Sequence, residues 1–290
     1  MVTTSATGFP RVFRGSHAVA ERAATWRQLH GPRFVRVAPD VYAPADLRRD
    51  HLLRAEGTAL VLPREALLTG ATAAAACGLP WLGWEDRVEV VLPEQCGRHP
   101  AARGVSARRS RSVLAAGRHW RGARLASPER IAFDAAARQP LTQAVARLDA
   151  LARHGVVHLP RLESWLRGRR DHGVVRVREC LPLTDPRAES LPESVLRVLL
   201  VLAGVEVEVQ HVIRDGEVFV ARADLAVVAH RVAVFYDGAW HALRLQQEKD
   251  RGQDHALAAA GWYALRLTAS DLAEPGRVVA LVRAAMARNA

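Results

Sequence analysis

The stretch that decides the fold is VEVEVQHVIRDGEVFVARADLAVVAHRVAVFYDG, residues 205–238. Residues 205–213 alternate between apolar and polar side chains, a pattern typical of a half-buried strand. Asp215 and Gly216 then predict a hairpin turn into a second strand over residues 217–228. A third, largely apolar strand is expected over residues 231–236. The stretch therefore predicts three consecutive strands.

A helix precedes these strands, and a helix, a strand and a helix follow them. The expected ranges are 193–204, 246–260, 262–268 and 276–287. The first helix ends at Gly204, which is a common helix stop. The core order is thus helix, three strands, helix and strand, which is the order of the restriction-endonuclease-like nucleases written PD-(D/E)XK. In that fold, carboxylates on the second and third strands converge on one divalent ion.

Three acidic residues fall at positions where they could meet at one edge of this sheet. Asp224 lies inside the second strand, where a carboxylate is costly unless it is paired or bound to metal. Asp237 ends the third strand, and Glu193 begins the first helix. Such a cluster could bind Mg²⁺, activate water and stabilise a leaving oxygen in phosphodiester hydrolysis. We predict Asp224, Asp237 and Glu193 as metal ligands and catalytic residues, with His241 as general base or acid.

Each residue taken alone also has a structural explanation. Asp237 with Gly238 can simply turn the chain, and Glu193 can simply complement the helix dipole. His241 can be a hydrogen-bonded boundary residue. Asp224 has the weakest structural explanation, because strand interiors seldom hold an unpaired Asp.

The N-terminal part predicts two short helices and a hairpin, the order of a winged helix-turn-helix. The expected segments are 16–24, 25–31, 33–37 and 41–43. Thr25 is a suitable N-cap for the second helix, which would carry Arg27, Gln28 and His30 toward DNA. The alternative is a small helical domain with a surface hairpin. Two further helices are expected, over 47–62 and 64–78.

The net charge of +11 indicates an acidic partner such as DNA. Residues 95–128 contain eight arginines and no acid, which predicts a phosphate-facing surface, the alternative being an ordinary solvated face. The eight are Arg98, Arg103, Arg108, Arg109, Arg111, Arg118, Arg121 and Arg124. We predict the first five of these as nucleic-acid contacts.

The chain of 290 residues, 49% of them hydrophobic, is long enough for several cores. We expect a multidomain α/β (α+β) protein: a winged-helix domain over 1–80, a basic mixed middle domain over 81–183, and the endonuclease-like domain over 188–290. The three cysteines lack paired spacing, so neither a disulfide scaffold nor a zinc site is expected. No leader or membrane-spanning segment is evident, which favours a cytoplasmic location.

The stretch from Leu183 to His241 resembles the endonuclease-like domains, related to the very-short-patch mismatch repair endonuclease, that are abundant in actinobacteria. WRQLHGPRFVRVAPDVYAP and ASPERIAFDAA resemble the winged-helix front half of AbiEi-type antitoxins from type IV toxin-antitoxin systems. The resemblance covers most of the chain and is strong from 184 to 270. It implies the same site, on Glu193, Asp224, Asp237, Gly238 and His241.

The chain departs from the endonuclease-like motif at Phe235, where those domains usually have Glu, and no lysine follows two residues later. Losing a carboxylate there would weaken ion binding. The mismatch repair endonuclease itself, however, has Phe-Thr-His-Gly and then Trp-His at the comparable strand end. FYDGAWH is similar to that version.

These observations favour a DNA-binding protein with an endonuclease-like domain, either Mg²⁺-dependent or inactive. The alternative is a non-catalytic DNA-binding regulator similar to AbiEi-type antitoxins. A protein–protein adaptor is a third class, and it explains the concentrated positive charge least well.

Overall fold

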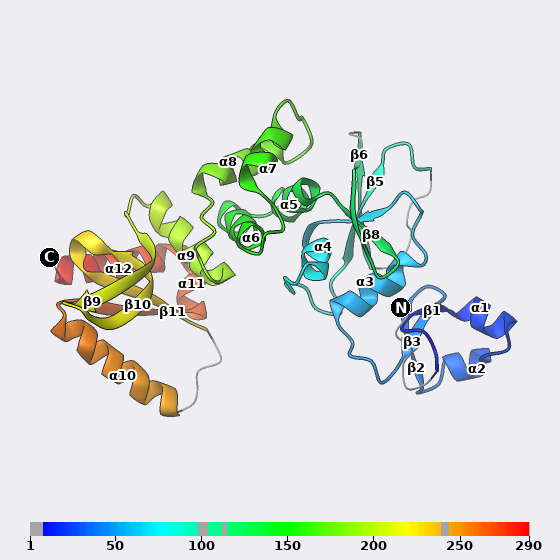
Figure 1. Ribbon diagram of the computed structural model, residues 1–290, viewed down its shortest axis with the longest axis horizontal. Helices are drawn as coiled ribbons and strands as arrows, with labels where there is room; N and C mark the ends of the chain where they lie inside the picture. The colour runs from blue at the N-terminus through cyan, green and yellow to red at the C-terminus, as the bar shows by residue number, and fades with distance from the viewer. Residues whose placement is uncertain (1–7, 98–103, 112–114, 239–243, 290) are drawn as a thin grey trace. The chain divides into compact units, whose positions relative to one another are not determined.

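The computed structural model describes residues 8–97, 104–111, 115–238 and 244–289. Within these ranges the fold is a mixed α/β, multidomain α+β arrangement with twelve α-helices and three sheets (Figure 1). The chain divides into two compact units, each made of two separate segments. Unit 1 comprises 1–137 and 156–174, and unit 2 comprises 138–155 and 175–290. No described helix is long and apolar enough to cross a bilayer.

Unit 1 begins with the predicted helix–helix–hairpin element. Its segments are β1 (Phe13–Arg14), α1 (Gly15–Ala20), α2 (Trp26–Leu29), β2 (Phe34–Ala38) and β3 (Val41–Pro44). The strands form a sheet in the order β1-β3-β2, over a small core that contains Leu29, Phe34 and Tyr42. The predicted N-cap is confirmed, because the Thr25 hydroxyl accepts from the Gln28 amide and the Gln28 side chain accepts from the Thr25 amide.

A five-stranded sheet follows in the order β6-β5-β4-β8-β7. Its strands are β4 (Leu67–Leu68), β5 (Val88–Pro93), β6 (Val105–Ser110), β7 (Ala116–Trp120) and β8 (Ala123–Ala126). The helices of this part are α3 (His51–Ala59), α4 (Gly70–Ala76), α5 (Pro128–Ala136) and α7 (Leu159–Leu166). In this sheet, β4 pairs with β5, so strands from both sides of the expected domain boundary at residue 80 belong to one sheet. The division into three domains stays a prediction.

The helix expected over 64–78 is wrong in its first half. Leu67 and Leu68 are buried and pair with Val91 and Val90 of β5, so this segment completes the sheet instead. The helix α4 starts only at Gly70, which has φ of +54°. A Cβ there would lie within van der Waals overlap of the Glu89 carboxylate, which is consistent with glycine at this tight corner.

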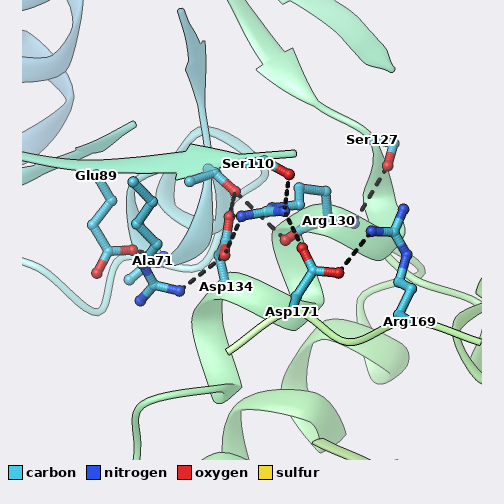
Figure 2. A network of polar contacts seen from close by, with 10 residues as sticks. Ala71, Glu89, Ser110, Ser127, Arg130, Asp134, Arg169 and Asp171 are labelled. Carbon is cyan, nitrogen blue, oxygen red and sulfur yellow. Dashed lines mark hydrogen bonds and ion pairs between the residues drawn. The ribbon is translucent and has the colours of Figure 1, made fainter. Parts of the chain in front are cut away.

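A buried polar network joins the sheet of unit 1 to α5 (Figure 2). The Asp134 carboxylate accepts from Arg130 Nε at 2.7 Å, Arg108 Nη1 at 2.9 Å and Thr69 Oγ1 at 2.7 Å. Arg130 also donates to Ser110 Oγ at 3.1 Å. Asp134 and Arg130 are both almost completely buried. Their burial is acceptable because each charge has several partners.

The same network reaches the second segment of unit 1. Arg130 lies 3.5 Å from Asp171, which in turn binds Arg169 at 3.1 Å (Figure 2). The Arg169 guanidinium stacks on the Trp165 ring, 3.4 Å from its centroid. The Arg130–Asp171 ion pair thus holds residues 156–174 to α5, whereas the Arg169–Asp171 pair and the cation–π contact lie within that segment.

Unit 2 contains the predicted C-terminal order. Its strands are β9 (Glu208–Asp215), β10 (Val218–Val227), β11 (Val232–Asp237) and β12 (Tyr263–Thr268). Its helical segments are α6 (Leu141–Arg153), α8 (Val174–Cys180), η1 (Leu181–Leu183), α9 (Leu191–Leu202), η2 (Val228–His230), α10 (Arg244–Ala259), α11 (Ala269–Leu272) and α12 (Pro275–Arg288). The sheet order is β12-β11-β10-β9, with β11 and β12 parallel and the other pairs antiparallel.

Both faces of this sheet are covered. One core contains residues of α9 and α12 packed on the strands, including Leu196, Val234 and Val282. The other contains Phe235 and Leu257, which belong to β11 and α10. In Figure 1, α10 and α12 are accordingly seen on different sides of the yellow strands. The predicted helix–strand–strand–strand–helix–strand order is confirmed, with α11 as an extra short helix.

Candidate functional site

The strands β10 and β11 separate at Asp224. Their ladder runs from Val227 paired with Val232 to Leu225 paired with Val234. Beyond that point β10 continues along β9, and β11 continues along β12. Where the ladder stops, the Tyr236 amide donates to Asp224 Oδ2 at 2.8 Å. A side-chain carboxylate thus replaces a backbone partner at the opening between the strands.

Gln210 and Glu193 adjoin Asp224. Gln210 lies on β9 between the residues that pair with Ala223 and Leu225, so it sits opposite Asp224. Its φ of +53° is unusual for a strand residue. Gln210 Nε2 donates to Glu193 Oε2 at 3.0 Å, whereas the buried Gln210 Oε1 has no hydrogen-bond partner among the described residues. One amide oxygen therefore stays unsatisfied beside two acids.

Glu193 is held by the start of α9. Its Oε1 accepts from Ser190 Oγ at 2.7 Å, and its Oε2 accepts from the Glu189 amide at 2.8 Å. The Glu193 amide in turn donates to Ser190 Oγ, so the pair forms a reciprocal cap. Glu193 thus has a structural role at the start of α9, and its role as a metal ligand stays a prediction.

The pKa of Asp224 is raised to about 6, and burial is the largest cause. The Glu193 and Glu189 carboxylates act in the same direction, while the hydrogen bond from the Tyr236 amide acts in the opposite direction. Burial and the neighbouring carboxylates therefore destabilise the ionised form of Asp224, and a bound cation would stabilise it.

Asp237 has a different set of partners. Arg266 Nη1 lies 3.6 Å from Asp237 Oδ1, and Arg266 Nη2 lies 2.9 Å from Asp254 Oδ1. The Arg266 guanidinium also lies over the ring of Phe235, 5.0 Å from its centroid. Phe235 is buried in the core under α10, so the position where the sequence resemblance led us to expect Glu is apolar.

The structure thus brings Asp224 and Glu193 together and gives Asp237 a cationic partner. Within the described ranges, no three His, Cys, Asp or Glu side chains form a group that could hold a metal ion. The prediction for His241 falls outside the described residues. A Mg²⁺ ion bound by Asp224, Asp237 and Glu193 stays a prediction.

The raised pKa of Asp224 predicts a pH-dependent stability. Between pH 3.8, its ordinary pKa, and about 6, the folded chain holds a proton that the unfolded chain has released. Stability therefore falls as the pH rises through this window. Because Asp224 is only half-buried, we expect a loss on the order of 1 kcal/mol after allowing for solvent screening.

Asp224→Asn should remove this dependence, because the amide is neutral and its oxygen can still accept from Tyr236. Urea denaturation should find the variant more stable than the wild type at about pH 8 and equal to it at about pH 4. Parallel pH profiles for the two proteins would contradict the assignment.

The predicted recognition helix is a single turn, and two of its three proposed DNA contacts are engaged internally. The Gln28 side chain caps the helix, and the His30 ring contacts the Trp26 carbonyl at 2.7 Å and the Tyr42 hydroxyl at 3.4 Å. Arg27 is exposed and pairs with no carboxylate among the described residues.

Two further arginines with the same character follow on β2 and just before it. Arg33 and Arg36 are exposed and have no carboxylate partner in the part of the chain that the structure describes. No acidic residue occurs between Thr25 and Ala38. Sequence reasoning did not select Arg33 and Arg36, although the absence of acids around them was a usable signal.

The arginines of residues 95–128 are used differently. Arg108 binds the buried Asp134, and Arg109 donates to the Glu94 and Cys96 carbonyls at 2.8 and 2.7 Å. Arg111 pairs with Glu94 at 3.0 Å and is largely exposed. The remaining partners are the Ala76 carbonyl for Arg118, Glu56 for Arg121 and the Arg64 carbonyl for Arg124.

Much of this positive charge is therefore balanced or anchored within unit 1. The predictions for Arg98 and Arg103 fall outside the described residues. Phosphate contact by Arg108, Arg109 and Arg111 stays a prediction.

No known family model matches the chain. The chain is similar to two uncharacterized proteins of Mycobacterium tuberculosis, MT2308 of strain CDC 1551 / Oshkosh and Rv2248 of strain ATCC 25618 / H37Rv. Each is 34% identical over 148 residues, which make up 48% of this chain and 53% of the relative. The chain thus spans about half the length of the curated relatives it matches. Among solved structures, it is similar to the crystal structure of the RV2827C protein from Mycobacterium tuberculosis, with a TM-score of 0.40 and 20% identity, covering 72% of this chain and 83% of that chain.

Proposed function

We propose that this chain binds double-stranded DNA through α2 and β2. The observation that supports the proposal is the set of three exposed arginines, Arg27, Arg33 and Arg36, on a segment without acidic residues. Elsewhere in unit 1, many arginines have carboxylate or carbonyl partners. Exposed guanidinium groups without such partners are the side chains that bind phosphate oxygens.

The engagement of Gln28 and His30 favours backbone contact over base reading. Side chains that read base edges need free donors and acceptors, and those of Gln28 and His30 are partly used within the helix. Binding dominated by phosphate contacts tolerates many sequences and depends strongly on salt. A DNA-binding regulator of this kind does not require catalysis by unit 2.

The salt dependence of duplex binding tests the proposal. With three phosphate contacts, log Kd should rise against log salt with a slope of about 3 or more, because each contact contributes about 0.9. Fluorescence anisotropy of a labelled duplex between about 0.05 and 0.2 M salt would measure this slope. Absence of binding at the lowest salt, or an affinity independent of salt, would overturn the proposal.

Cation-dependent hydrolysis by unit 2 is the second candidate, favoured by the unsatisfied Gln210 Oε1 beside Asp224 and Glu193. These oxygen donors fit a hard divalent cation such as Mg²⁺. A cation bound there would supply positive charge to polarise a phosphodiester. The donor set is smaller than the predicted three-acid set, because Asp237 pairs with Arg266 and position 235 is Phe.

We therefore expect no nicking of supercoiled plasmid by the wild type with Mg²⁺ or Mn²⁺. The apolar Phe235 removes a carboxylate that related domains use, which weakens ion binding. Gel electrophoresis of plasmid incubated with the full chain would measure nicking. Cleavage that disappears in Asp224→Asn would instead establish the second candidate, and cleavage that persists in that variant would exclude Asp224 as its ligand.

A further inference from the structure

A basic cavity of about 690 Å³ lies in unit 1. It is lined by residues of β1, β4, β7 and β8, by the end of α3 and by the chain between α3 and β4. Its basic lining residues are Arg14, Arg64, Arg124 and His119. None of the described residues that line it is acidic. Cavities of this volume are typical of small-molecule sites.

The three guanidinium groups have no carboxylate partner among the described residues. Arg14 Nη2 donates to the Leu60 carbonyl at 2.7 Å, and Arg124 Nη2 donates to the Arg64 carbonyl. These bonds restrict two long side chains but use few of the five N–H donors that each guanidinium carries. The cavity thus has positive charge that is partly oriented and not neutralised.

Glu56, an acidic residue of α3, does not neutralise the arginines of the cavity. Glu56 is buried, and its Oε2 binds Arg11 at 3.3 Å and Arg121 at 3.1 Å. Two other arginines therefore satisfy this carboxylate.

The rest of the lining is apolar. Leu60, Leu62 and Pro63 line it together with alanines and the buried Leu68. An inorganic anion alone would leave this apolar surface uncovered. A ligand that carries both an anionic group and an apolar body would contact both parts of the lining.

We propose that this cavity binds the phosphate group of a small phosphomonoester whose organic part packs on the leucines. A phosphate dianion offers three acceptor oxygens to the guanidinium groups, which match them in charge and geometry. This site is independent of the DNA surface on α2 and β2. Neither proposal requires the other.

Isothermal titration of the full chain with phenyl phosphate and with adenosine 5′-monophosphate tests the proposal. We expect saturable binding of at least one of them and none of phenol or adenosine, which lack the phosphate. Arg64→Gln should weaken binding at least about tenfold, because it removes one charge-assisted contact. Arg64 is exposed, and its side chain makes no hydrogen bond or ion pair with the described residues.

Arg161→Gln is the matched control, since Arg161 is exposed on α7 of the same unit and lies outside the cavity. Its affinity for the phosphomonoesters should equal that of the wild type. Equal weakening in both variants, or no saturable binding of either phosphomonoester, would overturn the proposal. If no phosphomonoester binds but Arg64→Gln weakens the binding of duplex DNA, the proposal is also overturned. The cavity would then be part of the DNA-binding surface.

Discussion

Replacing Arg27, Arg33 and Arg36 together by Gln is expected to weaken duplex DNA binding by about three orders of magnitude at 0.1 M salt. Each phosphate contact contributes about 0.9 to the salt slope, which corresponds to about tenfold in affinity at that concentration. The slope itself should fall by about 3. Fluorescence anisotropy over a salt series gives both quantities. The substitutions lie at exposed positions, so the fold should persist.

The control for this variant carries the same change in net charge. Arg161, Arg167 and Arg170 are exposed residues of unit 1 on α7 and the segment after it. Their joint replacement by Gln also lowers the formal charge from +11 by three. Only a weak, nonspecific loss of affinity is expected there. Equal losses in both triple variants would show that net charge, and not the α2–β2 surface, determines binding.

Asp134→Ala is expected to lower the free energy of unfolding of unit 1 by about 3–5 kcal/mol. The change leaves Arg130 buried without its principal carboxylate and removes the acceptor for Arg108 and Thr69. Removing one partner of a buried pair has an effect of this size, because the remaining charge stays desolvated. Urea denaturation followed by tryptophan fluorescence would measure the loss.

Two comparisons make this result interpretable if Asp134→Ala fails to fold. Asp134→Asn keeps an acceptor oxygen and should lose less stability than Asp134→Ala. Glu94→Gln breaks the exposed pair with Arg111 and should change the free energy of unfolding by less than about 1 kcal/mol. A loss for Asp134→Ala as small as that for Glu94→Gln would contradict the stabilising role of the network.

Local patterns were sufficient to predict the order of helices and strands over residues 191–288. The alternation from Val205, the turn at Asp215-Gly216 and the apolar run into Phe235 each depend on neighbours in sequence, and each gave the right element. The ends were less exact, because β9 starts only at Glu208. Strand ends depend on contacts between residues that are distant in sequence, and a local pattern does not contain these contacts.

The predictions that failed or stayed incomplete depend on contacts between distant residues. Leu67 and Leu68 form a strand because β5 and β8 lie on either side, and a two-residue strand has no periodicity of its own. Arg108 looked like a free cation because its partner, Asp134, lies 26 residues later. Gln210 was not selected, since only the folded strand pair places it opposite Asp224.

The two units alternate along the chain, and this order affects both folding during synthesis and the design of truncated fragments. Residues 138–155 belong to unit 2 but are made before residues 156–174, which complete unit 1. Arg130 therefore emerges from a ribosome before its partner Asp171, and α6 has to wait for α9, which supplies Arg197 for Asp149. No single truncation point separates the chain into one complete unit 1 and one complete unit 2. A fragment ending at residue 137 lacks the 156–174 segment, and one starting at residue 175 lacks α6. Unit 1 is complete after the chain has crossed between the units twice, and unit 2 is complete only after a third crossing.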